Sequence, residues 1–251
     1  MFIDTHCHLS KEDYEDIEQV LQDDRKEGVS PIIISGCTRN SIVESLEYSN
    51  KYSDVYVTIG YHPSESTITS DKDLNLLEKQ LHSDKVVGVG EIGLDYHYGK
   101  ESRCEQLSLF EKQLKLAEKY ELPVVIHSRD ATYDTIQCLK KYRVTGVIHC
   151  FSGSLETARE YIKMGFVLGI GGVVTFKNSN LKNVVEQISI NDIVLETDSP
   201  YLAPVPYRGK INSSKNIPVI AEFLAKELEQ NVNSIEKITE ENTKSLFTRL
   251  K

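Results

Sequence analysis

Pro123-Val124-Val125-Ile126-His127 is a short apolar run that ends in an ionisable side chain. Consecutive β-branched residues are typical of a strand that is covered on both faces, as the strands of a parallel sheet are. Val86-Val87-Gly88-Val89-Gly90-Glu91 follows the same plan, with small apolar residues before a carboxylate. The two stretches therefore predict buried parallel strands whose ends carry polar chemistry.

Runs of this kind recur along the chain and alternate with longer amphipathic stretches. The spacing of Leu107, Phe110, Leu114 and Ala117 is that of one face of a helix. We expect strands near Phe2 to His8, Pro31 to Gly36, Val55 to Gly60, Val86 to Glu91, Pro123 to His127, Gly146 to His149, Phe166 to Ile170 and Asp192 to Thr197. Repeated units of strand and helix predict the α/β class with a parallel sheet.

Eight such units within 251 residues favour closure into a (β/α)8 TIM barrel. The alternative is an open doubly wound sheet, which gives the same alternation. The sequence has no linker rich in Pro, Gly or Ser, so we expect one domain over residues 1–251. Ser10, Ser70 and Ser234 stand before polar turns and are expected to mark the starts of helices.

The composition is that of an ordinary folded chain, with 39% hydrophobic and 27% charged residues. A net charge of −9 argues against extensive non-specific binding to a phosphate backbone, although bound metal and a few Arg or Lys side chains can still form a local nucleic-acid site. The five cysteines include no C-x-x-C pair, which indicates reduced thiols and a cytoplasmic location. No apolar stretch approaches the ~20 residues that span a bilayer, and no obligate protein partner is indicated.

Four histidines occupy predicted strand ends, where the active sites of such barrels are built. His6 and His8 form an H-x-H pair, and the period of two along a strand points both imidazoles the same way. His127 and His149 are each the first polar residue after an apolar run. Neutral imidazoles held together suit a borderline divalent metal. The alternatives are a chance pair for H-x-H and hydrogen-bonded core residues for His127 and His149.

Two carboxylates occupy comparable positions. Glu91 ends a buried run, and a buried carboxylate needs a partner charge or a metal. Asp198 follows Ile193-Val194-Leu195-Glu196-Thr197, the last predicted strand, which lies beside the first in a closed barrel. The alternatives are a strand-end acid paired with a loop arginine for Glu91 and a turn residue before Ser199-Pro200 for Asp198.

Taken together, these six side chains lie at the ends of five predicted strands and favour a metal site over the separate alternatives. Six ligands exceed one tetrahedral set, so we expect two divalent cations that share a carboxylate. Glu91 is the expected bridge. The predicted metal ligands are His6, His8, Glu91, His127, His149 and Asp198, and the predicted catalytic residues are Asp198 and Glu91.

The same residues stand in strings that resemble the TatD family of metal-dependent deoxyribonucleases, a branch of the amidohydrolase-like metallo-barrels. The resemblance runs from end to end of the chain. The strings are Asp4-Thr5-His6-Cys7-His8-Leu9, Gly60-Tyr61-His62-Pro63, Gly90-Glu91-Ile92-Gly93-Leu94-Asp95-Tyr96, Leu122-Pro123-Val124-Val125-Ile126-His127-Ser128-Arg129-Asp130-Ala131, His149-Cys150-Phe151-Ser152-Gly153, Glu196-Thr197-Asp198-Ser199-Pro200-Tyr201-Leu202-Ala203-Pro204, Tyr207-Arg208-Gly209-Lys210 and Thr239-Glu240-Glu241-Asn242.

The resemblance implies a first metal on His6, His8, Glu91 and Asp198 and a second on Glu91, His127 and His149. Similar proteins cleave DNA, often from the 3′ end of single strands, with magnesium or another divalent ion. The sequence leaves open whether the ions are Mg, Mn or Zn. One departure is visible: the family usually has Asn-Glu-Pro where this chain has Asn212-Ser213-Ser214, which puts any role of that glutamate in doubt.

The expected chemistry is hydrolysis of a phosphodiester by water that two cations activate, with Asp198 orienting the water and accepting its proton. Further residues are predicted to bind substrate or to support the ligands, and each has a plain structural alternative as a turn, surface or salt-bridging residue. They are His62, Asp95, Arg129, Arg208 and Lys210. His82 and His97 do not stand at strand ends and are left out of the predicted site.

Three other functions fit the same residues. The first is a metallohydrolase of a small amide, ester or lactone, because two metals and an aspartate serve acyl transfer equally well. The second, again suggested by the resemblance, is removal of a D-amino acid from mischarged tRNA. The third is metal binding without catalysis, which predicts a closed coordination shell. Nucleic acid, with single-stranded DNA first, is the expected substrate.

Overall fold

The computed structural model describes residues 1–251, apart from the side chain of Tyr98. Its strands form one eight-stranded sheet in the sequence order β1 to β8, with helices between consecutive strands. The strands are β1 (Phe2–Cys7), β2 (Val29–Gly36), β3 (Val55–Ile59), β4 (Val86–Asp95), β5 (Val124–Arg129), β6 (Gly146–Ile148), β7 (Phe166–Ile170) and β8 (Ile193–Leu195). This order confirms the predicted (β/α)8 barrel class and excludes the doubly wound sheet, in which the strand order reverses.

The helices follow the strands along the chain. The α-helices are α1 (Ile17–Lys26), α2 (Arg39–Lys51), α3 (Asp71–Gln80), α4 (Tyr96–Gly99), α5 (Arg103–Tyr120), α6 (Thr132–Leu139), α7 (Leu155–Lys163), α8 (Leu181–Val185), α9 (Ile217–Glu227) and α10 (Val232–Leu246). The 3₁₀ turns are η1 (Pro63–Glu65), η2 (Lys100–Ser102), η3 (Gly172–Thr175), η4 (Ile190–Asp192) and η5 (Ser214–Asn216). Among the described residues, no helix combines the length and the apolar character needed to cross a membrane.

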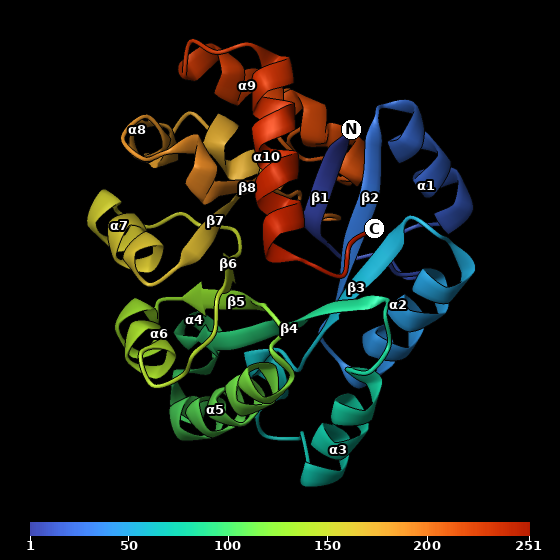
Figure 1. Cartoon of the computed structure of the whole chain (residues 1–251), viewed down its shortest axis with the longest axis vertical. Helices are drawn as coiled ribbons and strands as arrows, with labels where there is room; N and C mark the ends of the chain where they lie inside the picture. Colours follow the sequence, from blue (N-terminus) through green and yellow to red (C-terminus); the bar gives the residue numbers. More distant parts are fainter. The chain divides into compact units, whose positions relative to one another are not determined.

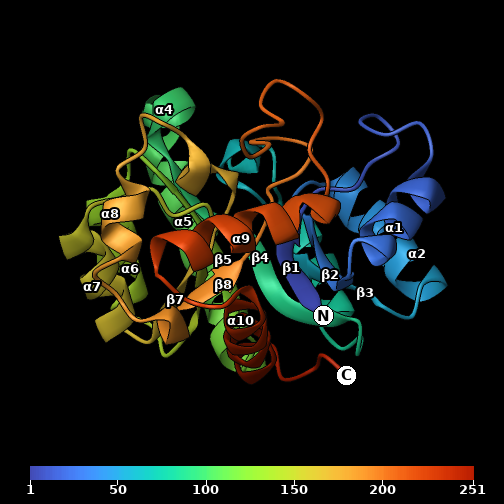
Figure 2. The same cartoon turned by 90° about the horizontal axis from the view of Figure 1, so that it is seen from above.

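The chain divides into two compact units, and the expectation of one domain over residues 1–251 stays a prediction. The first unit comprises Met1–Ile34 and His149–Ser245. Within it, a parallel β-bridge between Cys7 and Ser199 pairs the end of β1 with the segment that follows β8. Figure 2 shows α9 lying across β1 and β8, where its apolar face is buried. The packing of α9 and the bridge between Cys7 and Ser199 therefore hold the ends of β1 and β8 in place.

The second unit comprises Ser35–Ile148 and Leu246–Lys251. Figure 1 shows α5 lying alongside β4, and the buried face of this helix includes Leu109, Phe110, Leu114 and Ala117. Three of these four residues match the predicted helical face. Burial of such side chains stabilises the unit by roughly 1.5–3 kcal/mol for each large one, so α5 holds β4 in place.

Several predicted boundaries need correction. Ser70 caps α3 as expected, but Ser10 only closes a turn with Asp13, and α1 begins later with Asp16 as its cap. Ser234 is also wrong as a helix start, because it lies inside α10. β4 runs on to Asp95, since it pairs with β5 over that length, whereas β8 already ends at Leu195.

Candidate metal centre

The first unit gathers four predicted ligands, which we call the first cluster: His6, His8, His149 and Asp198. His6 lies in β1 and His8 just after it, so the alternation of the strand brings both rings to one side. His149 follows β6, and its ring stacks on that of His6 with centroids 4.1 Å apart. Asp198 follows β8 at φ 54°, a left-handed conformation that Asp tolerates better than most residues.

Three donor atoms of the first cluster face one another. The Nε2 atoms of His6 and His8 are 3.3 Å apart, and Asp198 Oδ1 lies 3.6 Å and 3.5 Å from them. The centre of a triangle with these edges lies about 2.0 Å from each corner, the length of a bond from zinc to imidazole nitrogen or carboxylate oxygen. One atom each from His6, His149 and Asp198 also lie within 4.8 Å of one another. The donor set fits a divalent cation.

The electrostatics of the first cluster keep Asp198 ionised. Burial opposes its charge, but the hydrogen bond from His8 and the nearby charges of His149, His6 and His8 outweigh the burial and hold its pKa below the ordinary value. An ionised carboxylate can bind a cation or accept a proton. Asp198 is therefore available for both tasks at neutral pH.

Glu196 contacts His149 of the first cluster, a role that was not predicted from the sequence. It is fully buried, its Oε1 accepts a hydrogen bond from the Cys150 backbone N–H at 2.5 Å, and the same oxygen lies 3.6 Å from His149 Nδ1. Burial raises the pKa of Glu196, and the nearby charge of His149 opposes that rise. Gly169 makes room for it, because an added Cβ would lie 2.1 Å from Glu196 Oε2. A carboxylate directly after an apolar run was the available signal.

Asp4 fixes the backbone that leads to Asp198. Its carboxylate accepts hydrogen bonds from Thr197 Oγ1 at 2.6 Å and from the Thr197 backbone N–H at 3.1 Å. Burial raises the pKa of Asp4 to about 7, and the Thr197 hydrogen bond counters part of the rise. Because Asp4 is in β1 and Thr197 follows β8, this contact joins the two segments that carry His6 and Asp198.

The second unit gathers Glu91, Asp95 and His127, with His62 beside them, and we call these residues the second cluster. His127 Nδ1 lies 2.8 Å from Glu91 Oε1, and its Nε2 lies 3.1 Å from Asp95 Oδ2. All three residues lie on the neighbouring strands β4 and β5. When Nε2 donates to Asp95, Nδ1 is left as the metal-binding nitrogen, which is the arrangement of a carboxylate behind a histidine ligand. The supporting role predicted for Asp95 stays a prediction, and this contact is the one that the role requires.

His62 makes the turn-stabilising hydrogen bond that was one of its two predicted alternatives, and its substrate contact stays a prediction. Its Nδ1 accepts a hydrogen bond from the Ser64 backbone N–H at 3.2 Å, which caps η1. Its Nε2 lies 3.9 Å from Glu91 Oε1, and its ring meets that of His127 edge-on with centroids 4.6 Å apart. The turn thus fixes a ring that also faces the second cluster.

The predicted cationic residues lie outside both clusters. Arg129 ends β5 and is exposed. Arg208 places its guanidinium 3.8 Å from the centre of the Phe176 ring, and Lys210 lies 5.9 Å from that of Tyr207. His97, left out of the predicted site, pairs with Asp130 at 2.9 Å, and its backbone N–H donates to Asp95.

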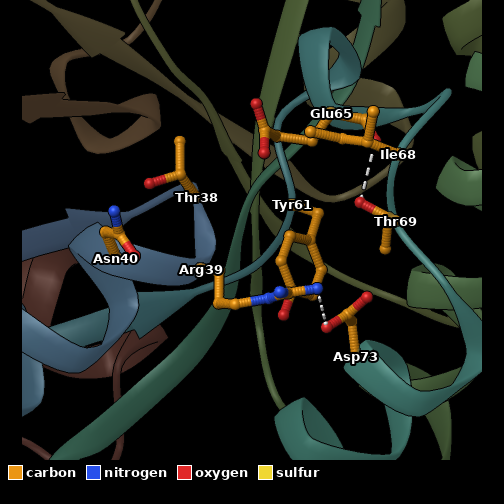
Figure 3. A pocket seen from close by; sticks show the side chains of 8 residues that line it. All are labelled: Thr38, Arg39, Asn40, Tyr61, Glu65, Ile68, Thr69 and Asp73. Carbon is orange, nitrogen blue, oxygen red and sulfur yellow. Dashed lines mark hydrogen bonds and ion pairs between the residues drawn. The ribbon is translucent and has the colours of Figure 1, made fainter.

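A hollow of about 370 Å³ lies in the second unit where β2 and β3 lead into their helices. Figure 3 shows Arg39 reaching past Tyr61 to Asp73, and the salt bridge between Arg39 and Asp73 measures 2.5 Å. Asp73 is buried, and its pKa is lowered by hydrogen bonds from Ser70 and by Arg39. The charge of Arg39 is therefore committed to Asp73.

Comparison with known proteins identifies the family. The family model described as TatD related DNase matches residues 3–248. The metal-dependent hydrolase YabD of Bacillus subtilis is 40% identical over 252 residues, which cover 98% of this chain and 99% of that protein. The metal-dependent hydrolase YcfH of Escherichia coli K12 is 32% identical over 253 residues, covering 98% and 95%.

The solved structures agree. The crystal structure of YjjV, a TatD homologue from Escherichia coli K12, has a TM-score of 0.92 at 32% identity and covers 98% of both chains. A lactonase from Deinococcus radiodurans, with a TM-score of 0.67 at 12% identity, shares the fold alone. The chain therefore belongs to the TatD family and is a metal-dependent hydrolase.

Proposed function

We propose that this chain is a deoxyribonuclease that hydrolyses phosphodiester bonds, from the 3′ end of single-stranded DNA, with two divalent cations. The observation that carries the proposal is the triangle of His6, His8 and Asp198 atoms, whose centre lies about 2.0 Å from each donor. The name of the matching family supports nucleic acid as the substrate. The five cysteines are free, which suits the cytoplasmic setting that belongs to this proposal.

The proposed ligands are the six that the sequence predicts. His6, His8, Glu91 and Asp198 hold the first cation, and Glu91, His127 and His149 hold the second. Bound divalent cations supply a field that lowers the pKa of water and stabilises negative charge on phosphoryl oxygens. Glu196 and Asp95 orient the imidazoles of His149 and His127.

Asp198 is the proposed general base. One of its oxygens faces His6 and His8, and its lowered pKa keeps the carboxylate ionised at neutral pH, the form in which it can take a proton from the attacking water. Arg129, Arg208 and Lys210 bind the phosphates that flank the cleaved bond. This assignment rests on their exposure and charge, and Arg suits two-pronged phosphate contacts.

The test uses single-stranded oligonucleotides labelled at the 3′ or the 5′ end, incubated with protein loaded with Mg, Mn or Zn. We expect stepwise loss of the 3′ label first. Asp198→Asn should lower the rate by about 10²- to 10⁴-fold, because it removes the proton acceptor, and metal content measured alongside separates this loss from loss of the ion that Asp198 helps to hold. Asp192→Asn, just before β8 in η4, is the matched control and should keep the parent rate.

Intact oligonucleotides with every metal would contradict the proposal. The parallel incubations identify the rival: release of p-nitrophenol from a small carboxylic ester indicates an acyl hydrolase, and release of a D-amino acid from tRNA indicates a deacylase. An Asp198→Asn variant as active as the parent would remove Asp198 from the mechanism.

A further inference from the structure

The loop after β8 exposes large apolar side chains next to the first cluster. Tyr201 is 59% exposed, and Val205, Tyr207 and Ile211 are exposed as well. The Tyr201 ring lies 6.3 Å from the His8 ring, centroid to centroid, at an angle of 62°. Tyr201 is therefore close enough to His8 to contact a substrate bound to a cation on His8.

The backbone of this loop is fixed from beneath by Asn212, which is fully buried. Its Nδ2 donates to the carbonyls of Tyr201 at 2.7 Å and Thr197 at 3.0 Å, and its backbone N–H donates to the Pro200 carbonyl at 3.0 Å. Asn212 is the one residue kept of the family's Asn-Glu-Pro. The ring of Tyr201 is thus presented to solvent by a rigid support.

A second contact fixes the far side of the loop. The Val205 backbone N–H donates to Thr175 Oγ1 at 2.9 Å, and a Cβ at Gly172 would lie 2.2 Å from the Leu202 carbonyl oxygen. Leu202 itself has φ 51°, which costs a non-glycine residue roughly 1–2 kcal/mol. The surrounding contacts therefore hold a strained backbone so that Tyr201 and Leu202 face outward.

The charge of the loop complements a nucleic acid. The chain as a whole has a net charge of −9, yet Arg208 and Lys210 stand together and exposed in this loop. The guanidinium of Arg208 stacks on the Phe176 ring, and this contact positions the side chain. Aromatic side chains interleaved with cations are the pattern of proteins that bind unpaired bases.

We propose that Tyr201 stacks on the nucleobase next to the cleaved phosphodiester and that this stacking selects single-stranded over duplex nucleic acid. The inference rests on the proposed nuclease function and adds a substrate-binding residue to it. A base can present its face to Tyr201 only when it has left the duplex stack. Arg208 and Lys210 bind the phosphates of the same strand.

The test compares oligonucleotides that carry a normal base or an abasic site at the 3′-terminal nucleotide. Tyr201→Ala should raise KM for the normal single strand by about 5- to 100-fold, the range of one base–aromatic stack, and leave KM for the abasic strand unchanged. Tyr201→Phe keeps the ring and should stay near the parent. Tyr133→Ala, at a residue that is 75% exposed on α6, is the matched control for loss of an exposed tyrosine.

Hydrolysis of bis(p-nitrophenyl) phosphate shows whether the parent hydrolyses a phosphodiester that has no nucleobase. Metal content, measured by mass spectrometry after dialysis, reports on the metal centre alone and should be equal in all four proteins. Equal KM values for parent and Tyr201→Ala on the normal strand would overturn the stacking proposal while the nuclease function stands. An equal rise on normal and abasic strands would also overturn it, because the effect would not come from the base. A parent that cleaves the small diester but no oligonucleotide would overturn both.

Discussion

In the first cluster three donor atoms face one another across gaps of 3.3 to 3.6 Å, whereas in the second cluster both nitrogens of His127 already meet carboxylates, at 2.8 and 3.1 Å. Three residues of the second cluster, Glu91, Asp95 and His127, lie on two neighbouring strands, β4 and β5. The first needs contacts between residues about 190 positions apart, of which Asp4 with Thr197 is the clearest. The difference indicates that pairing of neighbouring strands assembles most of the second cluster, while the first depends on contacts between segments that are distant in sequence.

The largest expected effect follows from this difference. His8→Ala removes one corner of the triangle, and we expect it to lower phosphodiester hydrolysis by at least about 10³-fold. The metal content, measured by mass spectrometry after dialysis, should fall from two ions per chain to one. If the variant retained two ions, binding of the first ion would not require the His8 corner of the triangle. His82→Ala, outside both clusters, is the control and should retain both ions.

The pKa shifts of acidic side chains also differ between the units. In the first unit burial raises the pKa of Asp24 to about 7, although hydrogen bonds from Lys215 and Ser213 lower it. In the second unit hydrogen bonds from Arg103 and Tyr96 hold the pKa of Asp134 below its ordinary value. Because the folded pKa of Asp24 exceeds its unfolded value, its contribution to stability is complete below about pH 4 and is lost as the pH rises through 7.

Asp24→Asn should therefore raise the free energy of unfolding at pH 8 by up to about 4 kcal/mol and change it little below pH 4. The asparagine oxygen can still accept the hydrogen bond from the Lys215 backbone N–H. Urea unfolding at several pH values measures the difference. A gain of the same size at low and high pH would show that charge on Asp24 is not its cause.

The smallest expected effect compares the two carboxylates that stand behind histidines. Glu196→Gln and Asp95→Asn should each reduce metal affinity or activity by about 10- to 100-fold, since each removes the charge that orients an imidazole. Metal titration followed by activity measures both. Both variants should weaken the second ion, which the proposal assigns to Glu91, His127 and His149, and should leave the ion on His6 and His8 in place. Loss of the ion on His6 and His8 in either variant would contradict this assignment.

The sequence predicts the strands and most ligands well, because apolar runs and polar strand ends are local patterns. The bounds of β7 match the prediction in full, and the strand end at His127 is extended by only two residues. Helix starts were predicted less well. Ser10 and Ser70 each have an aspartate three residues later, yet Ser70 begins a helix with a capping box, whereas Ser10 closes a turn. Local pattern could not distinguish the Ser10 turn from a cap.

Long-range support could not be predicted at all. Glu196 is useful only because Gly169 leaves space for it, and Asn212 only because its amide reaches two carbonyls in the preceding loop. Both depend on segments that are distant in sequence or on a shape that no spacing reveals. The sequence of the loop after β8 likewise resembles the family, but only the structure shows that Tyr201 is exposed.

The most direct test of the proposed centre is a crystal structure of zinc-loaded protein with the ions located by anomalous scattering. The proposal predicts two ions, one bonded to the Nε2 atoms of His6 and His8 and to Asp198, and one bonded to His127 Nδ1 and Glu91. A zinc-saturated crystal with no ion bonded to His6 and His8 would contradict it.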